Sequence, residues 1–381
     1  MTPRRVYQVN LQQEFGGGEV YTRFFTLALI ELGYQVVLFV SRKAGFWASL
    51  LPAGVDIVRV DGADEILRRL PPEEALIVTQ TALDADAAQW VAERHLLCGF
   101  VHMPLYQRDP GGLKHYRQLW AVSQHVLDSV RARGHYMVFA EPMYGVADPR
   151  RGAAAGAIVA RSEYDWDRRK LRDRLLGLTE PWWRMGQSKS AFEKKPGLTL
   201  GIVSRLTPIK QFPLMFGTLA PVIAGFPEIN LEIFGNGGYA SLRDLRASLA
   251  PIAKQARFWG HQPDVSTVYP QLDYVLSGLP EKEALGLNLI EAQFCGTPVL
   301  AVRALPFTET VIEGESGFMF DDPREDAGAS FAQLLRRLQQ GAARPDPRLA
   351  TAHLERFSFA AFRQRVARAL ASAEAAHPAQ T

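Results

Sequence analysis

The chain has 381 residues, of which 47% are hydrophobic and 22% charged, and its formal net charge is +3. This length allows two domains with separate cores, and the composition excludes a disordered chain. So small a net charge gives no reason to expect nucleic acid as a partner. Cys98 and Cys295 stand alone in the sequence, which argues against a disulfide framework and against a cysteine metal site.

No targeting or membrane-spanning segment is expected from the sequence. Residues 1–20 lack the apolar core of a signal peptide, and no apolar run approaches the roughly 20 residues that cross a bilayer. We therefore expect a soluble protein of the cytoplasm.

The first half of the chain alternates short apolar segments with helical patterns. A glycine loop, residues 14–20, joins the first of these strands to a helix that ends near Gly33. Residues 121–135 are expected to hold the end of a strand and then an amphipathic helix. Such alternation predicts a parallel sheet covered on both faces. The expected strands are residues 5–11, 34–41, 55–60, 75–81 and 98–103, with the last strand and its exit loop at 137–149.

A basic and irregular stretch, residues 150–197, separates the two halves. Within it, residues 162–177 are expected to form a helix that Ser162 caps and that carries acids in its first turn. Cations and a pair of tryptophans lie close together over residues 165–184. This composition leaves two interpretations open: a solvated helix above a packed tryptophan pair, or peripheral contact with anionic lipid headgroups at the inner face of the membrane.

The second half repeats the strand and helix alternation and predicts a second doubly wound sheet. In such sheets nucleotides bind beyond the carboxyl ends of the strands. The tail is expected to be helical. The expected strands are residues 198–206, 229–238, 257–261 and 273–280, followed by a buried strand near 299–302.

The segment from Glu283 to Val302 combines two carboxylates with the signals of a short helix and a buried strand. Glu283 and Glu291 flank the start of the helix, Gly286 loosens it, and Gly296 supplies a left-handed cap at its end. The first N–H groups of the helix have no partner within it, so they favour an anion, above all phosphate. A phosphate site between two acids suits a nucleotide sugar.

The spacing of Glu, seven residues and Glu, followed by Ala and a Gly-Thr-Pro-Val turn, resembles the signature of the retaining glycosyltransferases of family 4. The resemblance implies an α/β protein of the GT-B fold, in which two Rossmann-like, doubly wound domains face a central cleft. We accordingly expect an N-terminal acceptor-binding domain at residues 1–190, including the basic linker, and a C-terminal nucleotide-sugar domain at 198–355. A last helix, 356–381, would pack back on the first domain.

The resemblance also implies a role for each residue of the signature. Glu283 would hold the sugar hydroxyls at the reaction centre, and Glu291 would bind the ribose. The residues at the start of the helix, Gly286, Leu287 and Asn288, would bind the diphosphate of the donor through their amides.

Two cations follow the buried strand at 198–206. Arg205 and Lys210 should therefore lie at its carboxyl end, where they could stabilise the charge that grows on a departing diphosphate. Their spacing matches the Gly-Arg-Leu…Lys-Gly element of the resembled family. The sequence departs from that element at Ser204 and at Gln211, where the family usually has glycine.

Three further donor contacts are expected in the second half. The Gly-Asn-Gly turn resembles the Gly-Asp-Gly turn of the family, which places Asn236 beside the nucleotide. Arg257 and Phe258 lie in a strand that resembles the one whose end meets the base. An ordinary glycine turn and an ordinary strand are the alternative interpretations.

In the first half, His102 ends a predicted buried strand, where the family often places a histidine near the reaction centre. A histidine satisfied within the core is the alternative. Gly17 and Gly18 would face the diphosphate and the acceptor, unless they only form a tight turn before a helix. The loop lacks the spacing of a dinucleotide-binding fingerprint.

The resemblance implies a hexosyltransferase-type enzyme that needs no metal ion and no cofactor. A nucleoside-diphosphate sugar would be the donor substrate, and a saccharide or a lipid-linked molecule the acceptor, in cell-surface polysaccharide or glycolipid synthesis. Two acid pairs, Asp84/Asp86 and Asp165/Asp167, imitate an Asp-x-Asp metal motif. Neither follows a convincing nucleotide-binding strand, so we expect no metal site.

Two other functions can share this fold. A nucleotide-sugar epimerase usually needs additional acid and base residues, which the sequence does not reveal. A non-catalytic GT-B partner subunit would not need the intact set of acids and cations. A nicotinamide oxidoreductase is disfavoured because the fingerprint loop is absent.

Overall fold

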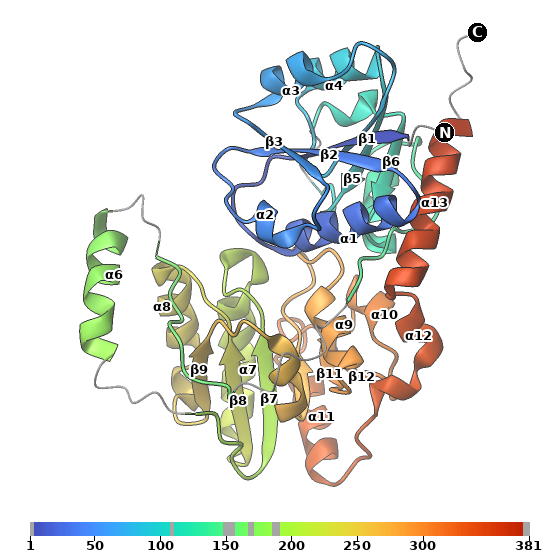
Figure 1. Ribbon diagram of the computed structural model, residues 1–381. Coiled ribbons are helices and arrows are strands. Elements are labelled where there is room, and N and C mark those ends of the chain that lie inside the picture. The colour runs from blue at the N-terminus through green and yellow to red at the C-terminus, as the bar shows by residue number, and fades with distance from the viewer. Residues whose placement is uncertain (1–3, 107–109, 148–156, 167–170, 185–190, 376–381) are drawn as a thin grey trace. The chain divides into compact units, whose positions relative to one another are not determined.

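The structure is a computed structural model, and it describes residues 4–106, 110–147, 157–166, 171–184 and 191–375. The chain folds into two units, Met1–Val146 together with Glu355–Thr381, and Ala147–Leu354 (Figure 1). Each unit contains a parallel sheet with helices packed against it. The predicted pair of doubly wound domains is confirmed at this level.

The first unit is built on a sheet of strand order β3-β2-β1-β4-β5-β6, in which all neighbours are parallel. The strands are nearly continuous apolar runs because both faces of the sheet are covered. The strands are β1 (Arg5–Asn10), β2 (Gln35–Ser41), β3 (Asp56–Val60), β4 (Leu76–Thr79), β5 (Leu96–Val101) and β6 (Gln118–Ala121). The helices are α1 (Gly17–Glu31), α2 (Trp47–Leu50), α3 (Ala63–Arg69), α4 (Ala85–Ala92), α5 (Gln124–Ala132) and α13 (Phe359–Ala375), with a 3-10 turn η1 (Leu113–His115).

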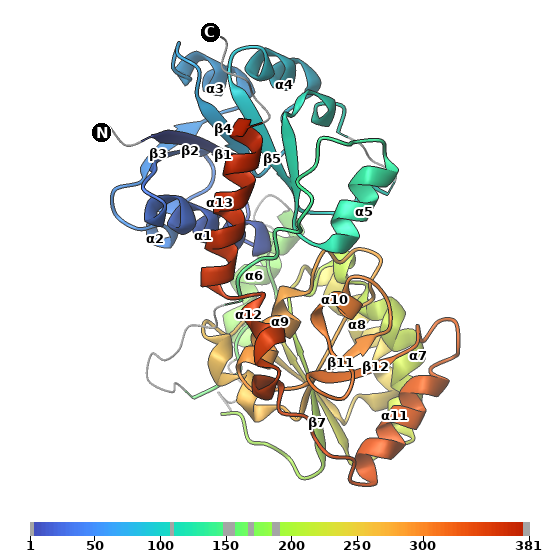
Figure 2. The same ribbon diagram turned by 90° about the vertical axis from the view of Figure 1, so that its right-hand side faces the viewer.

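The C-terminal helix α13 belongs to the first unit and lies along α1 (Figure 2). The ring of Phe362 meets that of Tyr21 edge to face, with centroids 5.3 Å apart. Arg365, which is buried, donates from its guanidinium to the carbonyl of Tyr144 at 2.9 Å. These contacts explain why a segment so far along the chain is part of the N-terminal unit.

The last strand of the first sheet differs from the prediction. The sequence suggests a strand end near residue 121 and a last strand within residues 137–149. The strand end belongs to β6, Gln118–Ala121, which is the last strand of the sheet. Of the predicted segment, Val138 forms one isolated parallel bridge with Leu119, and residues 148–149 lie outside the described part. A strand of four residues is too short to stand out by its hydrophobic pattern.

The second unit has the strand order β12-β11-β10-β7-β8-β9, again entirely parallel. The strands are β7 (Leu198–Val203), β8 (Ile229–Phe234), β9 (Ala256–Gly260), β10 (Tyr274–Leu276), β11 (Val299–Val302) and β12 (Gly317–Phe320). The helices are α6 (Leu171–Arg184), α7 (Phe212–Ala224), α8 (Tyr239–Ser248), α9 (Leu287–Phe294), α10 (Phe307–Thr310), α11 (Ala329–Gln339) and α12 (Thr351–Glu355). The 3-10 turns are η2 (Pro208–Lys210), η3 (Ala250–Ile252), η4 (Val265–Thr267), η5 (Tyr269–Gln271) and η6 (Pro347–Leu349).

The segment that the sequence assigns to the first domain as a linker packs in the second unit. Arg161 donates its backbone N–H to the carbonyl of Trp259 at 3.0 Å, and Asp165 donates to the carbonyl of Gly237 at 2.9 Å. The boundary therefore falls after Val146 rather than at residue 190. These backbone bonds tie the segment to the edge of the second sheet.

The predicted helix at residues 162–177 is also shifted. Residues 157–166 are irregular, with isolated bridges at Val159 and Tyr164, and α6 spans Leu171–Arg184. Ser162 caps no helix; its hydroxyl donates to the carboxylate of Glu180 within α6. Pairing with the second sheet thus prevails over a local capping pattern.

Candidate functional site

The strands β7, β8 and β9 end at one edge of the second sheet, and a cavity of about 180 Å³ opens there. Sites for small molecules usually measure roughly 300–1,000 Å³, so this cavity suits part of a ligand such as a nucleoside. Several of its lining groups are polar and converge from different elements. The lining residues are Val203, Ser204, Arg205, Phe234, Gly235, Asn236, His261, Gln262, Val265, Tyr269, Asn288 and Glu291.

Four of the predicted site residues meet in this cavity: Arg205, Asn236, Asn288 and Glu291. Arg205 follows β7 and is exposed to solvent. Asn236 follows β8, and its carbonyl accepts the backbone N–H of Leu206 at 2.8 Å. The loops after two neighbouring strands are therefore bonded to each other at the rim of the cavity.

A glycine after β8 permits this close approach. Gly235 has a φ of +144°, and a Cβ added there would lie 1.8 Å from the carbonyl oxygen of Ser204. Only glycine fits such a position without displacing backbone. The predicted role of this turn is to let a nucleotide approach closely, whereas the contact in the structure is between two strand ends.

Helix α9 begins beside the cavity, as the motif predicts. Gly286 adopts the left-handed conformation with a φ of +82° before the first helical residue, and Leu289 and Ile290 are buried. Asn288 donates from its side-chain amide to the carbonyl of Val203 at 3.1 Å, which fastens the start of α9 to the end of β7. The first-turn amides of Leu287 and Asn288 have no partners within the helix and form a region that favours anions.

Glu291 lies one turn further along α9, in a desolvated position. Burial raises the pKa of its carboxyl to about 7, and a hydrogen bond donated by the Tyr269 hydroxyl at 3.1 Å offsets this only in part. A carboxylate with so few donors around it retains the capacity to accept hydrogen bonds from ligand hydroxyls.

Glu283 and Lys210 form an ion pair, with Nζ and Oε2 2.5 Å apart. The other carboxylate oxygen of Glu283 accepts the N–H of Ala284 at 3.2 Å. Neither side chain lines the 180 Å³ cavity. The pair joins two predicted catalytic residues from η2 and from the loop before α9.

In the first unit, His102 lies just after β5. Its Nε2 is 2.8 Å from Oε1 of Gln80, and its ring packs edge to face against Tyr21 with centroids 5.0 Å apart. Desolvation lowers the pKa of His102 to about 4, so the imidazole is neutral at pH 7. Gly17 and Gly18 form the first turn of α1, where an added Cβ would meet no atom within 4 Å.

The two residues predicted to contact the base lie outside the cavity. Arg257 lies near the start of β9, where its guanidinium is held by the buried carboxylate of Glu232 through Nε at 2.9 Å and 3.0 Å. Phe258 packs under the guanidinium of Arg246, 4.3 Å from the ring centroid. Neither residue lines the cavity, because β9 continues for two more residues before it ends.

Two residues immediately after β9 also line the cavity and were not predicted. His261 is exposed at the rim, and Gln262 is buried, donating to the carbonyls of Val159 and Trp259 at 3.0 and 2.8 Å. The rule that ligands bind beyond the carboxyl ends of strands points to this pair. The sequence pattern does not show that β9 ends at Gly260, and only this end point places His261 and Gln262 beyond the strand.

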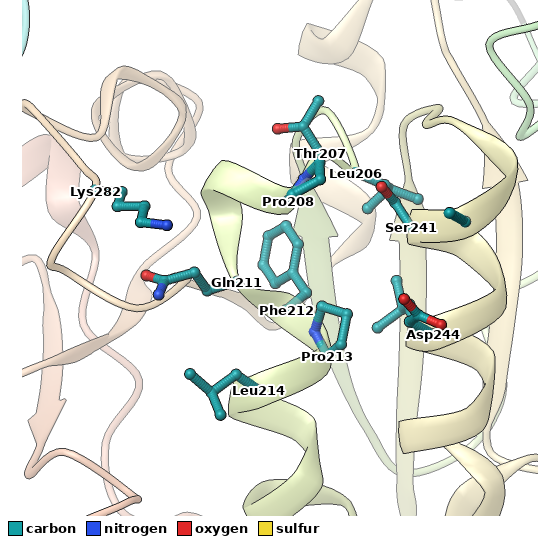
Figure 3. Close-up of a pocket in the computed structure, with 12 residues that line it drawn as sticks. Leu206, Thr207, Pro208, Gln211, Phe212, Pro213, Leu214, Ser241, Asp244 and Lys282 are labelled. Carbon is teal, nitrogen blue, oxygen red and sulfur yellow. The ribbon is translucent and has the colours of Figure 1, made fainter.

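A larger cavity of about 300 Å³ lies between the start of α7 and helix α8 (Figure 3). Phe212, Pro213 and Leu214 give it an apolar wall, and Asp244 and Lys282 lie at its margin. Five of its twelve lining residues are polar, against eight of twelve in the smaller cavity, and none of the predicted site residues lines it. We therefore assign the candidate site to the smaller cavity. Among the described residues, no group of three or more His, Cys, Asp or Glu could hold a metal ion.

The second unit is similar in sequence to a known protein family. Residues 187–342 match the family described as Glycosyl transferases group 1. The chain is 32% identical over 143 residues to the D-inositol 3-phosphate glycosyltransferase of Rhodococcus jostii, a match that covers 35% of this chain and 31% of the relative. It is 30% identical over 148 residues to the GDP-mannose-dependent monoacylated alpha-(1-6)-phosphatidylinositol monomannoside mannosyltransferase of Corynebacterium glutamicum, covering 34% and 38%. The chain thus spans about a third of the length of these curated relatives.

The whole chain resembles solved structures. The crystal structure of Anabaena Alr3699/HepE in complex with UDP-glucose superposes with a TM-score of 0.66 at 17% identity, over 97% of this chain and 99% of that chain. The chain has the GT-B fold. The match to the family described as Glycosyl transferases group 1 falls in the second unit. Among the described helices, none is long and apolar enough to cross a membrane.

Proposed function

We propose that this protein is a retaining glycosyltransferase of family 4, which transfers a sugar from a nucleoside-diphosphate sugar to an acceptor hydroxyl. The observation that carries the proposal is the cavity at the ends of β7, β8 and β9. There a cation, an anion-favouring helix start and a carboxylate with spare acceptor capacity converge. The family match of residues 187–342 covers the elements that supply these groups.

The groups divide naturally over the parts of such a donor. Glu291 would accept hydrogen bonds from the ribose hydroxyls, and Asn236 would lie beside the nucleoside. Arg205, together with the amides of Leu287 and Asn288, would bind the diphosphate. Binding the ribose at Glu291 would favour the ionised form of a carboxyl that burial alone keeps partly protonated at pH 7.

Lys210 and Glu283 would act on the transferred sugar. In the free protein each neutralises the other. With donor bound, we expect Glu283 to turn to the sugar hydroxyls and Lys210 to the leaving diphosphate. Preorganised donors of this kind typically contribute about 3–4 kcal/mol to transition-state stabilisation.

In the proposed reaction, the bond between the anomeric carbon and the β-phosphate oxygen breaks, and the acceptor oxygen bonds to the same face of that carbon. The acceptor proton passes to a phosphate oxygen of the leaving group, so no protein base is required. This accords with the neutral state of His102, for which we propose a contact to the donor sugar rather than proton transfer. For Gly17 and Gly18, at the start of α1, we propose contacts to diphosphate and acceptor.

The finer assignments rest on the resemblance and on the relatives. We propose a hexosyltransferase that works without a metal ion or cofactor, and a saccharide or lipid-linked acceptor in polysaccharide or glycolipid synthesis on the cytoplasmic side of the membrane. The name of one relative includes GDP-mannose and a phosphatidylinositol mannoside, and one structural neighbour was solved with UDP-glucose.

Thermal unfolding with a panel of UDP-, GDP- and ADP-sugars tests the donor class. A nucleotide at 100 times its Kd is expected to stabilise the native protein by about 2.7 kcal/mol. Arg205→Ala should weaken this effect for nucleoside diphosphates more than for nucleosides. The proposal fails if no nucleoside diphosphate stabilises the protein.

Product analysis tests the reaction with the donor found in that panel. The expected result is release of nucleoside diphosphate that depends on the acceptor, with the anomeric configuration of the donor kept in the product by proton NMR. Conversion of the nucleotide sugar into an epimer without acceptor would identify an epimerase instead.

A further inference from the structure

Helix α6 belongs to the second unit (Figure 1), and it carries large apolar side chains that are exposed to solvent. At 100° per residue, four large apolar side chains fall within about 60° of one another on this helix. Soluble proteins rarely leave such a row of large side chains open to water. The members of this row, hereafter the α6 stripe, are Leu171, Leu175, Leu178 and Trp182, with exposed fractions of 70%, 57%, 73% and 79%.

The opposite face attaches the helix to the rest of the unit by polar contacts. Glu180 accepts from the indole of Trp166 at 2.5 Å and from the hydroxyl of Ser162. A Cβ added at Gly177 would lie 3.2 Å from the ring of Trp166, so the two surfaces are close together. Polar anchoring inside and leucines outside is the reverse of the usual arrangement for a surface helix.

The exposed charges of α6 are positive where the structure describes its side chains. Both acids of the helix, Asp173 and Glu180, are buried. Arg172 and Arg174 are exposed and flank the stripe on its two sides; Arg172 also pairs with Asp173 and lies over the ring of Tyr239 in α8. Leucines and a tryptophan bordered by arginines form the pattern of helices that lie in the interface of an anionic bilayer.

A second copy of the chain fits this surface less well. A stable protein interface takes roughly 800 Å² and 20–30 residues from each partner, while the α6 stripe offers four apolar side chains. Two copies of the helix would also bring their exposed arginines together. A lipid surface needs no complementary shape and favours cations.

We propose that the α6 stripe is a docking surface for anionic phospholipid bilayers, in which the three leucines and Trp182 enter the headgroup region. Arg172 and Arg174 would contact lipid phosphates beside them. The proposal concerns attachment alone and does not depend on the chemistry proposed for the cavity. It assigns the membrane contact predicted for residues 165–184 to one face of Leu171–Arg184.

Co-sedimentation of the full chain with vesicles tests the proposal. The full chain is expected to bind vesicles of equal parts phosphatidylcholine and phosphatidylglycerol, and to bind pure phosphatidylcholine much less. The double substitution Leu175→Ser with Leu178→Ser should reduce binding about a hundredfold or more, because each buried leucine contributes about tenfold or more. Arg174→Gln should reduce it about fivefold, and added salt should reduce it further.

The matched control is Leu349→Ser, which removes a leucine of the same unit that is 80% exposed and lies outside the stripe. It should leave vesicle binding unchanged, and thermal unfolding should be alike in all variants because no altered side chain is buried. A second readout uses Trp182→Phe. Vesicles should shift the tryptophan emission of the wild type to shorter wavelengths, and this shift should be lost in Trp182→Phe while binding persists.

Three results would overturn the proposal. The first is no binding to the anionic vesicles, and the second is binding that the double leucine substitution leaves unchanged. The third is a dimer in light scattering that the same substitution dissociates while vesicles are ignored, which would make the stripe an interface between copies of the chain.

Discussion

The Glu291 carboxyl is expected to lower the free energy of unfolding at neutral pH, so Glu291→Gln should stabilise the protein. Burial raises the pKa of the carboxyl from 4.5 to about 7 because the hydrogen bond from Tyr269 does not replace the lost hydration. The folded protein therefore holds this proton more tightly than the unfolded chain does. The contribution of the carboxyl to the free energy of unfolding is most favourable below pH 4.5 and falls as the pH rises to about 7.

The size of the effect follows from the shift. A rise of the pKa from 4.5 to about 7 corresponds to about 3 kcal/mol, at about 1.4 kcal/mol for each unit. Glu291→Gln keeps an oxygen that can accept from Tyr269, but it cannot ionise. At pH 8 the variant should exceed the wild type by up to about 3 kcal/mol in free energy of unfolding, and at pH 4.5 the two should be nearly equal.

Urea unfolding followed by tryptophan fluorescence at a series of pH values provides the measurement. The quantity of interest is the difference between variant and wild type, in which the titration of all other groups largely cancels. Glu315→Gln, which removes an exposed carboxylate of the same unit, supplies the baseline. A difference for Glu291→Gln that stays constant from pH 4.5 to pH 8 would contradict a raised pKa of the Glu291 carboxyl. A carboxylate kept at such a cost to stability is expected where a ligand uses it.

The remaining predictions concern the cation, the glycine turn and the histidine. Lys210→Ala should lower the rate of sugar transfer by about 10²–10³-fold in steady-state assays. The control is Lys254→Ala, which replaces an exposed lysine of the same unit and should leave the rate unchanged. Equal rates for the two variants would count against a role of Lys210 in catalysis. Gly235→Ala should destabilise the protein by about 2–4 kcal/mol in urea unfolding, because its Cβ would meet the carbonyl of the preceding strand end, whereas Gly238→Ala has open space and should change stability by less than about 0.5 kcal/mol. The imidazole of His102 should not titrate between pH 5.5 and pH 8 in ¹⁵N NMR, since its pKa is lowered to about 4; a midpoint near 6.5 would contradict the desolvation on which this rests.

The sequence predicts those features of the structure that depend on residues close together in the chain. Gly286 and Gly296 mark the limits of α9 because both positions have positive φ, of +82° and +80°, which glycine adopts without strain. The cavity residues Arg205, Glu291 and Asn288 were likewise predictable, since each lies a fixed number of residues from a strand end or helix start. Hydrophobic runs alone were sufficient to predict two parallel sheets.

The sequence does not predict the contacts of residues whose partners lie far away in the chain. Ser162 carries the pattern of a helix cap, but its segment pairs instead with the turn at Gly237, more than 70 residues away. Arg257 was predicted to contact the base of the donor, but in the structure its guanidinium is paired with the carboxylate of Glu232 on the neighbouring strand. The pairing of Lys210 with Glu283 joins residues 73 positions apart and could not be inferred from either motif alone.

We propose above all that the second unit binds the nucleoside diphosphate at the ends of β7, β8 and β9. A crystal structure of the protein with its preferred nucleoside diphosphate tests this most directly. The account predicts the diphosphate at the amides of Leu287 and Asn288 beside Arg205, with the ribose hydroxyls on Glu291. A nucleotide bound in the larger cavity beside Phe212, or by other residues altogether, would contradict this proposal.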